Sequence, residues 1–108
     1  MKISEVRRLA LALPEATEAP HHHLSSFRVQ GKIFATVAPD GSFMNVFVGD
    51  EQRDMMVTVD PQAYESLTWG KIAYLHVHVA AAKPRDVKAL LRAAWERKAP
   101  KKLLAKAG

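Results

Sequence analysis

Cysteine is missing from this sequence of 108 residues, and several features that would define a functional class are missing with it. Without cysteine there is no disulfide framework, no thiol nucleophile and no cysteine metal site. No window approaches the roughly 18 consecutive apolar residues that a membrane span needs. Arg7 and Arg8 fall where a signal peptide would have its apolar run, so secretion is not expected. We therefore expect a cytoplasmic protein that does not enter a membrane.

Sequence motifs of enzymes are missing as well. The chain contains no GxSxG, HExxH, GxxxxGK[ST] or GxGxxG segment. None of its five glycines begins a loop that could hold phosphate between a strand and a helix. Paired carboxylates such as Glu15/Glu18 and Asp50/Asp54 fall in an expected loop or at an expected helix start, where solvation and capping explain them. The sequence therefore predicts a protein without enzymatic activity and without a cofactor.

The composition that is present is that of one globular domain. Of the residues, 48% are hydrophobic and 25% are charged, as in ordinary folded proteins. A chain of this length has room for one domain and one hydrophobic core. We therefore expect a single domain over residues 1–108, ending in a basic tail at about 99–108.

Basic charge is concentrated in the second half of the chain. Residues 1–54 carry six basic and seven acidic side chains, whereas residues 55–108 carry ten basic and four acidic ones. Nine of the ten follow from Lys83 onward. Such a segment favours encounter with anionic partners such as nucleic acid or acidic surfaces. The alternative is a solvated helix face followed by a frayed tail.

The pattern of apolar residues predicts a two-layer α+β domain. Along 72–80 the apolar residues alternate as in a half-buried strand, and the last helix has one apolar stripe. Short connections favour antiparallel neighbours, so the helices should cover one face of an antiparallel sheet in the order α-β-β-β-α-β-β-α. The expected helices are 4–13, 51–57 and the segment from Pro84 to Pro100; the expected strands are 25–30, 32–38, 42–48, 67–69 and 72–80, and 15–22 is expected as a loop.

Histidine supplies one candidate site. His76 and His78 are two apart on an expected strand and so share a face, while His21, His22 and His23 are consecutive in an expected loop. Neutral imidazole is a common ligand of zinc, nickel and copper, so two strand histidines plus His21 or His23 could supply a metal site. The alternative is that His76 and His78 are exposed strand residues and that His21, His22 and His23 belong to a polar loop.

Nucleic-acid binding has broader support. Basic residues recur at two expected hairpins and along the last helix, where they can contact phosphates, and two aromatic residues can stack on bases. We expect the basic residues to gather on one continuous surface. The candidate residues are Arg28, Lys32, Trp69, Lys71, Tyr74, Arg85, Lys88, Arg92, Lys101 and Lys102.

Five segments carry a resemblance to a known family: LALPE at 11–15, SFRVQGKIFA at 26–35, Trp69-Gly70, LLRAAW at 90–95 and APK at 99–101. By these segments the chain resembles the MmcQ/YjbR-like family of small bacterial proteins. The resemblance implies an α-β-β-β-α-β-β-α fold similar to CyaY and to secretion-chaperone domains. It also implies DNA binding by two β-hairpins that form a double wing, here the hairpins at Gln30-Gly31 and Gly70-Lys71.

Two other functions stay open at this point. The uncovered sheet face or an edge strand could bind another protein or a second copy of the chain, since edge strands invite pairing into a homodimer. The histidines could make the chain a metal-binding protein. DNA binding is the leading hypothesis, because the charge asymmetry and the family resemblance both favour it.

Overall fold

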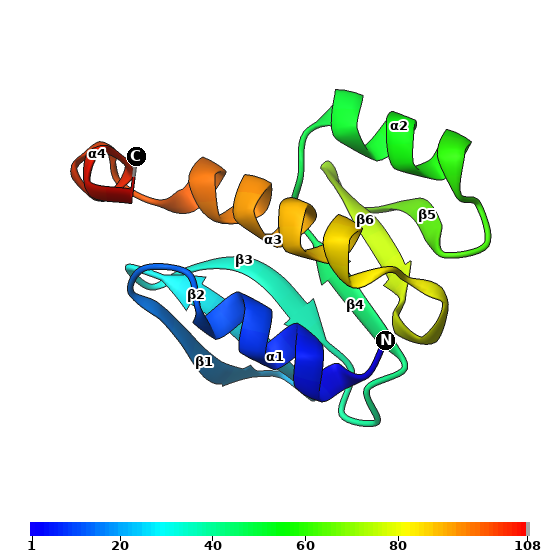
Figure 1. Ribbon diagram of the computed structural model, residues 1–108, viewed down its shortest axis with the longest axis horizontal. Helices are drawn as coiled ribbons and strands as arrows, with labels where there is room; N and C mark the ends of the chain where they lie inside the picture. Colours follow the sequence, from blue (N-terminus) through cyan, green and yellow to red (C-terminus); the bar gives the residue numbers. More distant parts are fainter. Residues whose placement is uncertain (108) are drawn as a thin grey trace.

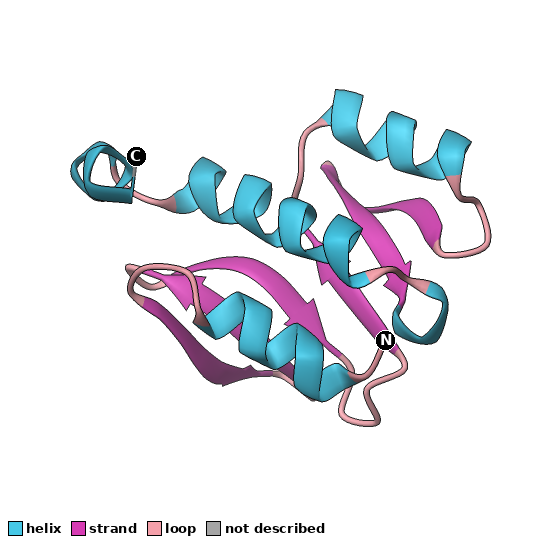
Figure 2. Ribbon diagram, in the orientation of Figure 1, coloured by secondary structure: helices cyan, strands magenta, loops and turns pink. Residues whose placement is uncertain are grey.

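The computed structural model describes residues 1–107, which form a layer of helices on a sheet of six strands (Figure 1 and Figure 2). The helices are α1 (Ile3–Leu11), α2 (Asp50–Val59), α3 (Pro84–Lys98) and α4 (Lys101–Ala107), with a short 3₁₀ helix, η1 (Val79–Ala81). The strands are β1 (Ala16–His21), β2 (Leu24–Val29), β3 (Lys32–Val37), β4 (Phe43–Val46), β5 (Tyr64–Trp69) and β6 (Ile72–His78).

Each strand of the sheet runs antiparallel to its neighbours, in the spatial order β1-β2-β3-β4-β6-β5. β1 and β5 are therefore the two edges. Helices α1, α2 and α3 lie on one face of the sheet (Figure 2), and the opposite face is here called the open face. The expected α+β class, with helices on one face of an antiparallel sheet, is confirmed.

Alternate residues of the central strands point to the helices and form the core. Because side chains alternate between the two faces of a strand, one face collects most of the apolar residues. Helix α3 supplies the matching stripe, and burying each large apolar side chain contributes about 2 kcal/mol to folding. The buried residues include Ala35, Val37, Met44, Val46, Leu75 and Val77 on the central strands, and those of α3 are Val87, Leu90, Leu91, Ala94 and Trp95.

Strand β1 corrects one expectation from the sequence. The segment 15–22 was expected as a loop because it is polar and contains Pro20, but Ala16–His21 pairs with β2 along its whole length. A proline has no N–H to donate, yet an edge strand tolerates it because one side of the strand has no neighbour. Four strands rather than three therefore precede α2.

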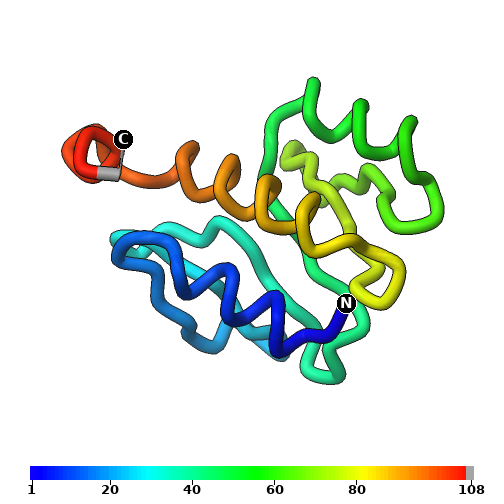
Figure 3. The backbone as a smooth tube through the Cα atoms, in the orientation of Figure 1, coloured from blue at the N-terminus to red at the C-terminus, as the bar shows by residue number. Residues whose placement is uncertain are grey.

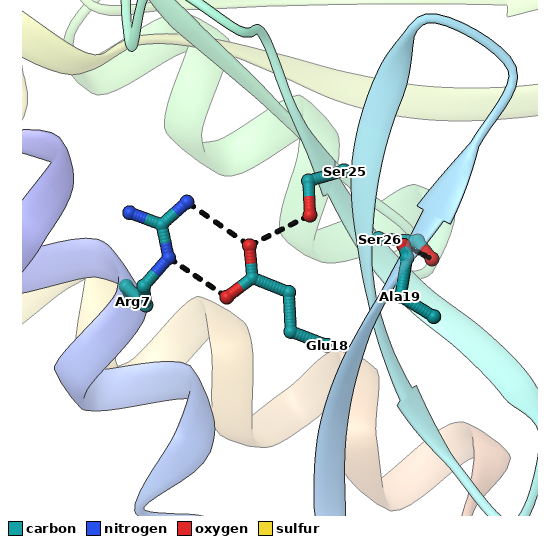
Figure 4. A network of polar contacts seen from close by, with 5 residues as sticks. All are labelled: Arg7, Glu18, Ala19, Ser25 and Ser26. Atoms are coloured by element: carbon teal, nitrogen blue, oxygen red, sulfur yellow. Dashed lines mark hydrogen bonds and ion pairs between the residues drawn. The ribbon is translucent and has the colours of Figure 1, made fainter.

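An ion pair ties α1 to this edge strand (Figure 4). The guanidinium of Arg7 donates two hydrogen bonds to the carboxylate of Glu18, at 2.7 and 3.0 Å, and the hydroxyl of Ser25 donates a third at 2.6 Å. The hydrogen bond from Arg7 lowers the pKa of Glu18, an effect that partial burial opposes and the Ser25 bond reinforces. The ion pair therefore links α1 to the edge of the sheet formed by β1.

Both hairpins expected from the sequence are present, although β5 begins at Tyr64 rather than at 67. Gln30 and Gly31 both have positive φ angles, 52° and 76°, as the tightest hairpin turns require. Gly70 has a φ of 61° in the second turn. Val46 of β4 pairs with Ala35 on one side and with Leu75 on the other, each four residues after its turn. The two turns therefore lie at the same end of the sheet, here called the hairpin end.

The last residues differ from the expected tail. Residues 101–107 form helix α4, since lysine, leucine and alanine favour helix and Leu103 is buried against the core. Gly108, which the expected tail included, lies outside the described residues. Figure 3 follows the chain from Met1, whose ammonium group donates to the carbonyl of Val79 at 3.1 Å, to α4 at the far end of α3. Within residues 1–107, no helix is long and apolar enough to cross a bilayer.

Candidate functional site

The open face is hollowed by a groove of about 750 Å³. It reaches from the turn between β1 and β2, across the open face, to the hairpin formed by β5 and β6. Its walls are built from residues that alternate with the core residues of the same strands. The residues that line it are His21, His22, His23, Leu24, Gly31, Lys32, Ile33, Thr36, Asn45, Phe47, Trp69, Ile72, Tyr74 and Lys98.

Large apolar side chains lie in this groove without cover. Trp69 of β5 and Ile72 of β6 form a direct cross-strand pair, and they are 73% and 52% exposed. The rings of Tyr74 and Phe47 lie beside each other, with centroids 6.0 Å apart. Exposed apolar residues gathered in a groove mark a binding surface more often than a structural one.

Positive charge borders the groove at the hairpin end. Lys32 begins β3 and Lys98 ends α3, and both line the groove, while the exposed Lys71 lies in the turn between Trp69 and Ile72. Arg97 of α3 donates to the carbonyl oxygen of Phe47 at 2.7 Å, which holds the end of α3 against this rim. No aspartate or glutamate is among the described residues that line the groove.

One carboxylate does lie at the hairpin end. Glu15, which precedes β1, accepts a 2.5 Å hydrogen bond from the side-chain amide of Gln30 in the first turn. Both side chains are exposed, so water and salt screen the charge of Glu15. The groove wall itself keeps an excess of cationic groups.

The expected nucleic-acid residues do not gather on one surface. Lys32, Trp69 and Tyr74 line the groove, and Lys71 lies beside it. Arg28 is also on the open face, but its guanidinium is held within the sheet by bonds to the hydroxyl of Ser26 at 2.9 Å and the carbonyl of Pro20 at 3.2 Å.

The remaining basic residues are not among the described residues that line the groove. Arg85 and Lys88 are exposed on α3, and therefore on the side of the molecule opposite the open face. Arg92 of the same helix lies 4.0 Å from Glu96 and stacks 5.6 Å from the ring centroid of Trp95. Lys101 and Lys102 are exposed on α4. Arg85 and Lys88 therefore do not join Lys32 and Lys71 on the open face, and the expectation of one continuous basic surface is wrong for these two residues. Of the residues described in α3, only Lys98 at its end reaches the groove.

The histidines divide into two groups. His76 and His78 lie on the open face of β6 with Glu65 opposite them on β5, and one ligand atom from each lies within 4.8 Å of the others. His21 and His23 are outside this cluster and line the groove. Burial lowers the pKa of His76, the charge of His78 adds to the effect, and Glu65 opposes it.

Some residues of these sites had no signal in the sequence. Glu65 lies eleven positions before His76, and only the strand register places it opposite that histidine. Asn45 was not singled out, yet its carbonyl oxygen lies 2.7 Å from Nδ1 of His76. A diagram of the hairpin formed by β5 and β6, drawn in the correct register, could have placed Glu65 opposite His76. Finding Asn45 also required the knowledge that β4 lies beside β6 in the sheet.

These features define an antiparallel α+β domain with an uncovered, grooved sheet face. The YjbR family model matches residues 11–97, and the chain therefore belongs to the YjbR family, as the resemblance in the sequence predicted. The crystal structure of Deinococcus radiodurans protein DR2400, with the family-model domain DUF419, is similar, with a TM-score of 0.71 and 17% identity over 87% of this chain and 75% of that one. At that identity the likeness shows the fold alone. The comparison with curated proteins found no match.

Proposed function

We propose that this protein binds DNA, without enzymatic activity, through the groove at the hairpin end of its open face. The observation that carries the proposal is the combination of an exposed tryptophan with lysines in one groove wall, whose described residues include no carboxylate. Lysine can neutralise phosphates, and aromatic rings can stack on bases. The proposal therefore rests on fewer basic residues than the sequence suggested: Lys32, Lys71 and Lys98.

Unpaired bases suit this groove better than a duplex. Stacking on Trp69 or Tyr74 needs a base whose flat face is accessible, and this is a property of single strands. A two-stranded hairpin can also enter the major groove of duplex DNA, so both forms are worth measuring. We expect tighter binding to a single-stranded oligonucleotide than to a duplex of the same sequence.

Fluorescence anisotropy with labelled DNA at several salt concentrations tests the proposal. For single strands, the logarithm of the affinity falls with the logarithm of salt by about 0.7 for each phosphate contact. The double variant Lys32→Gln/Lys71→Gln should reduce this slope by about 1.4 and weaken binding at low salt. The matched control, Arg85→Gln/Lys88→Gln, removes the same charge from the opposite side of the molecule and should change binding much less.

Two results would remove the proposal. One is no binding to either form of DNA at low salt. The other is an equal loss of affinity in both double variants, which would mean that only net charge matters.

The exposed pair of Trp69 and Ile72 also favours a second candidate, self-association of two copies through the open face. Sedimentation of the wild type and of Trp69→Ala, without DNA, distinguishes the two. A concentration-dependent dimer that Trp69→Ala abolishes supports the second candidate, whereas a monomer at all concentrations contradicts it.

A further inference from the structure

The cluster of Glu65, His76 and His78 has no role in the proposed binding of DNA. The three residues belong to β5 and β6, which are neighbouring antiparallel strands (Figure 1). Because side chains alternate along a strand, all three lie on the open face. Glu65 is directly opposite His76, and His78 is two residues further along β6 on the same face. Each of the three side chains is partly accessible to solvent, so an ion can reach them.

The distances within the cluster fit a metal ion. Two ligands that are each about 2.1 Å from a zinc ion, at tetrahedral angles, are about 3.4 Å apart. Nε2 of His78 lies 3.6 Å from Oε1 of Glu65, close to that separation, and the third ligand atom lies within 4.8 Å of both. The three side chains are therefore close enough together to be ligands of a single ion.

Hydrogen bonds that involve two neighbouring residues already orient one of the histidines. Nδ1 of His76 donates to Oδ1 of Asn45 at 2.7 Å, and the amide of Asn45 donates to the hydroxyl of Thr36 at 3.3 Å. These bonds place the proton of His76 on Nδ1 and leave Nε2 with the lone pair that binds metals. Metal-binding histidines in proteins commonly have such a partner on their second nitrogen.

We propose that Glu65, His76 and His78 form a binding site for a divalent transition-metal ion. Two imidazoles and one carboxylate suit zinc and its first-row neighbours, whereas magnesium and calcium prefer oxygen ligands alone. Three protein ligands leave at least one coordination position for water or another ligand. Asn45 is the positioning residue, and it also lines the groove, so the ion would add positive charge beside the groove wall.

Zinc binding to the chain without an affinity tag, purified without nickel resin and treated with chelator, tests the site. Competition with a chromophoric zinc indicator, in the absence of DNA, should give one zinc ion per chain. His76→Ala/His78→Ala should weaken binding more than about a hundredfold, because even outer-shell partners contribute ten- to hundredfold. The matched control, His21→Gln/His22→Gln/His23→Gln, removes three other exposed or half-exposed imidazoles and should change the affinity less than about twofold, since distant sites act independently.

Asn45→Ala should weaken zinc binding about tenfold or more. It should also change the ¹⁵N chemical shifts of the His76 ring in the metal-free protein, because the proton is no longer held on Nδ1. A merely structural role for Asn45 would leave that tautomer unchanged. Glu65→Gln tests the carboxylate in the same assay and should also reduce the affinity.

Wild-type protein provides a measurement that does not depend on the folding of any variant. Added cobalt(II) should broaden the NMR signals of His76 and His78 before those of His21, His22 and His23. No zinc binding by the wild type, or binding and broadening that follow the 21–23 histidines instead, would overturn the proposal. Because no DNA is present, its failure would leave the proposed function untouched.

Discussion

On the face of the sheet that α1, α2 and α3 cover, apolar side chains are hidden from water, whereas on the open face several are left in it. Leu75 and Ile72 show the contrast on a single strand: Leu75 is fully buried, and Ile72, three residues earlier, is 52% exposed. The two tryptophans show the same contrast. Trp95 lies on the sheet-facing side of α3 and is fully buried, whereas Trp69 is 73% exposed.

This difference separates residues that hold the fold from residues that are available for binding. Burial of an apolar side chain stabilises the folded chain in proportion to the surface removed from water. An exposed apolar side chain contributes little of that stability, so its cluster in a groove with lysines is better explained by a ligand. The covered face therefore accounts for most of the stability, and the open face is where we propose that a ligand binds.

The largest expected effect comes from a matched pair of substitutions on β6 that could break this comparison. Leu75→Ala should lower the free energy of unfolding by about 2–5 kcal/mol, because it leaves a cavity in the core. Ile72→Ala, which also shortens an aliphatic residue of the same strand, should lower it by less than about 1 kcal/mol. Urea unfolding followed by circular dichroism measures both. Equal losses in the two variants would mean that the open face is as important to the fold as the core.

A smaller effect on the free energy of unfolding is expected from the ion pair of Arg7 and Glu18, which joins α1 to the edge strand β1. Glu18→Gln should lower the free energy of unfolding at neutral pH by about 1 kcal/mol, since the charge-assisted bonds to Arg7 are lost but lie in partly exposed surroundings. The hydrogen bond from Arg7 holds the pKa of Glu18 below its ordinary value of 4.5 in the folded chain. The stabilisation is therefore complete above the ordinary pKa and is lost as the pH falls through the lower folded value.

Unfolding of the wild type and Glu18→Gln at pH 7 and at about pH 3 checks this sign. The difference between the two proteins should shrink at the lower pH, which lies below the ordinary pKa of a glutamate. A difference that stays constant, or grows in acid, would show that the ion pair is not its source.

Much of the fold could be predicted from the sequence because periodicity is a local property. The alternation along 72–80 and the apolar stripe of α3 each follow from the geometry of one element. The edge strand β1 could not be predicted in this way, because Pro20 and the polar residues around it resemble a loop until β2 is known to lie beside them. Helix α4 was missed for a related reason. Leu103 packs against core residues that are distant in the sequence, so the local pattern does not show that it is buried.

The candidate sites depended more on tertiary structure. Lys32, Lys71 and Trp69 were predicted from their places in two hairpins, and the sheet order then brings both hairpins to one end. Arg85 and Lys88 were grouped with them because charge along the chain carries no information about which side of the sheet a helix covers. Glu65 and Asn45 join the two histidines only through strand register.

The central claim is that DNA binds on the open face, and the two indole N–H groups test it in a single ¹H–¹⁵N NMR spectrum. The indole of Trp69 lies in the groove, whereas Nε1 of Trp95 donates to the carbonyl of Pro14 at 3.0 Å beneath α3. Titration with a single-stranded oligonucleotide, with Trp69→Phe used for assignment, should shift or broaden the Trp69 indole signal until saturation and leave that of Trp95 in place. Saturable binding that moves the amides of Arg85 and Lys88 but not the Trp69 indole would contradict it.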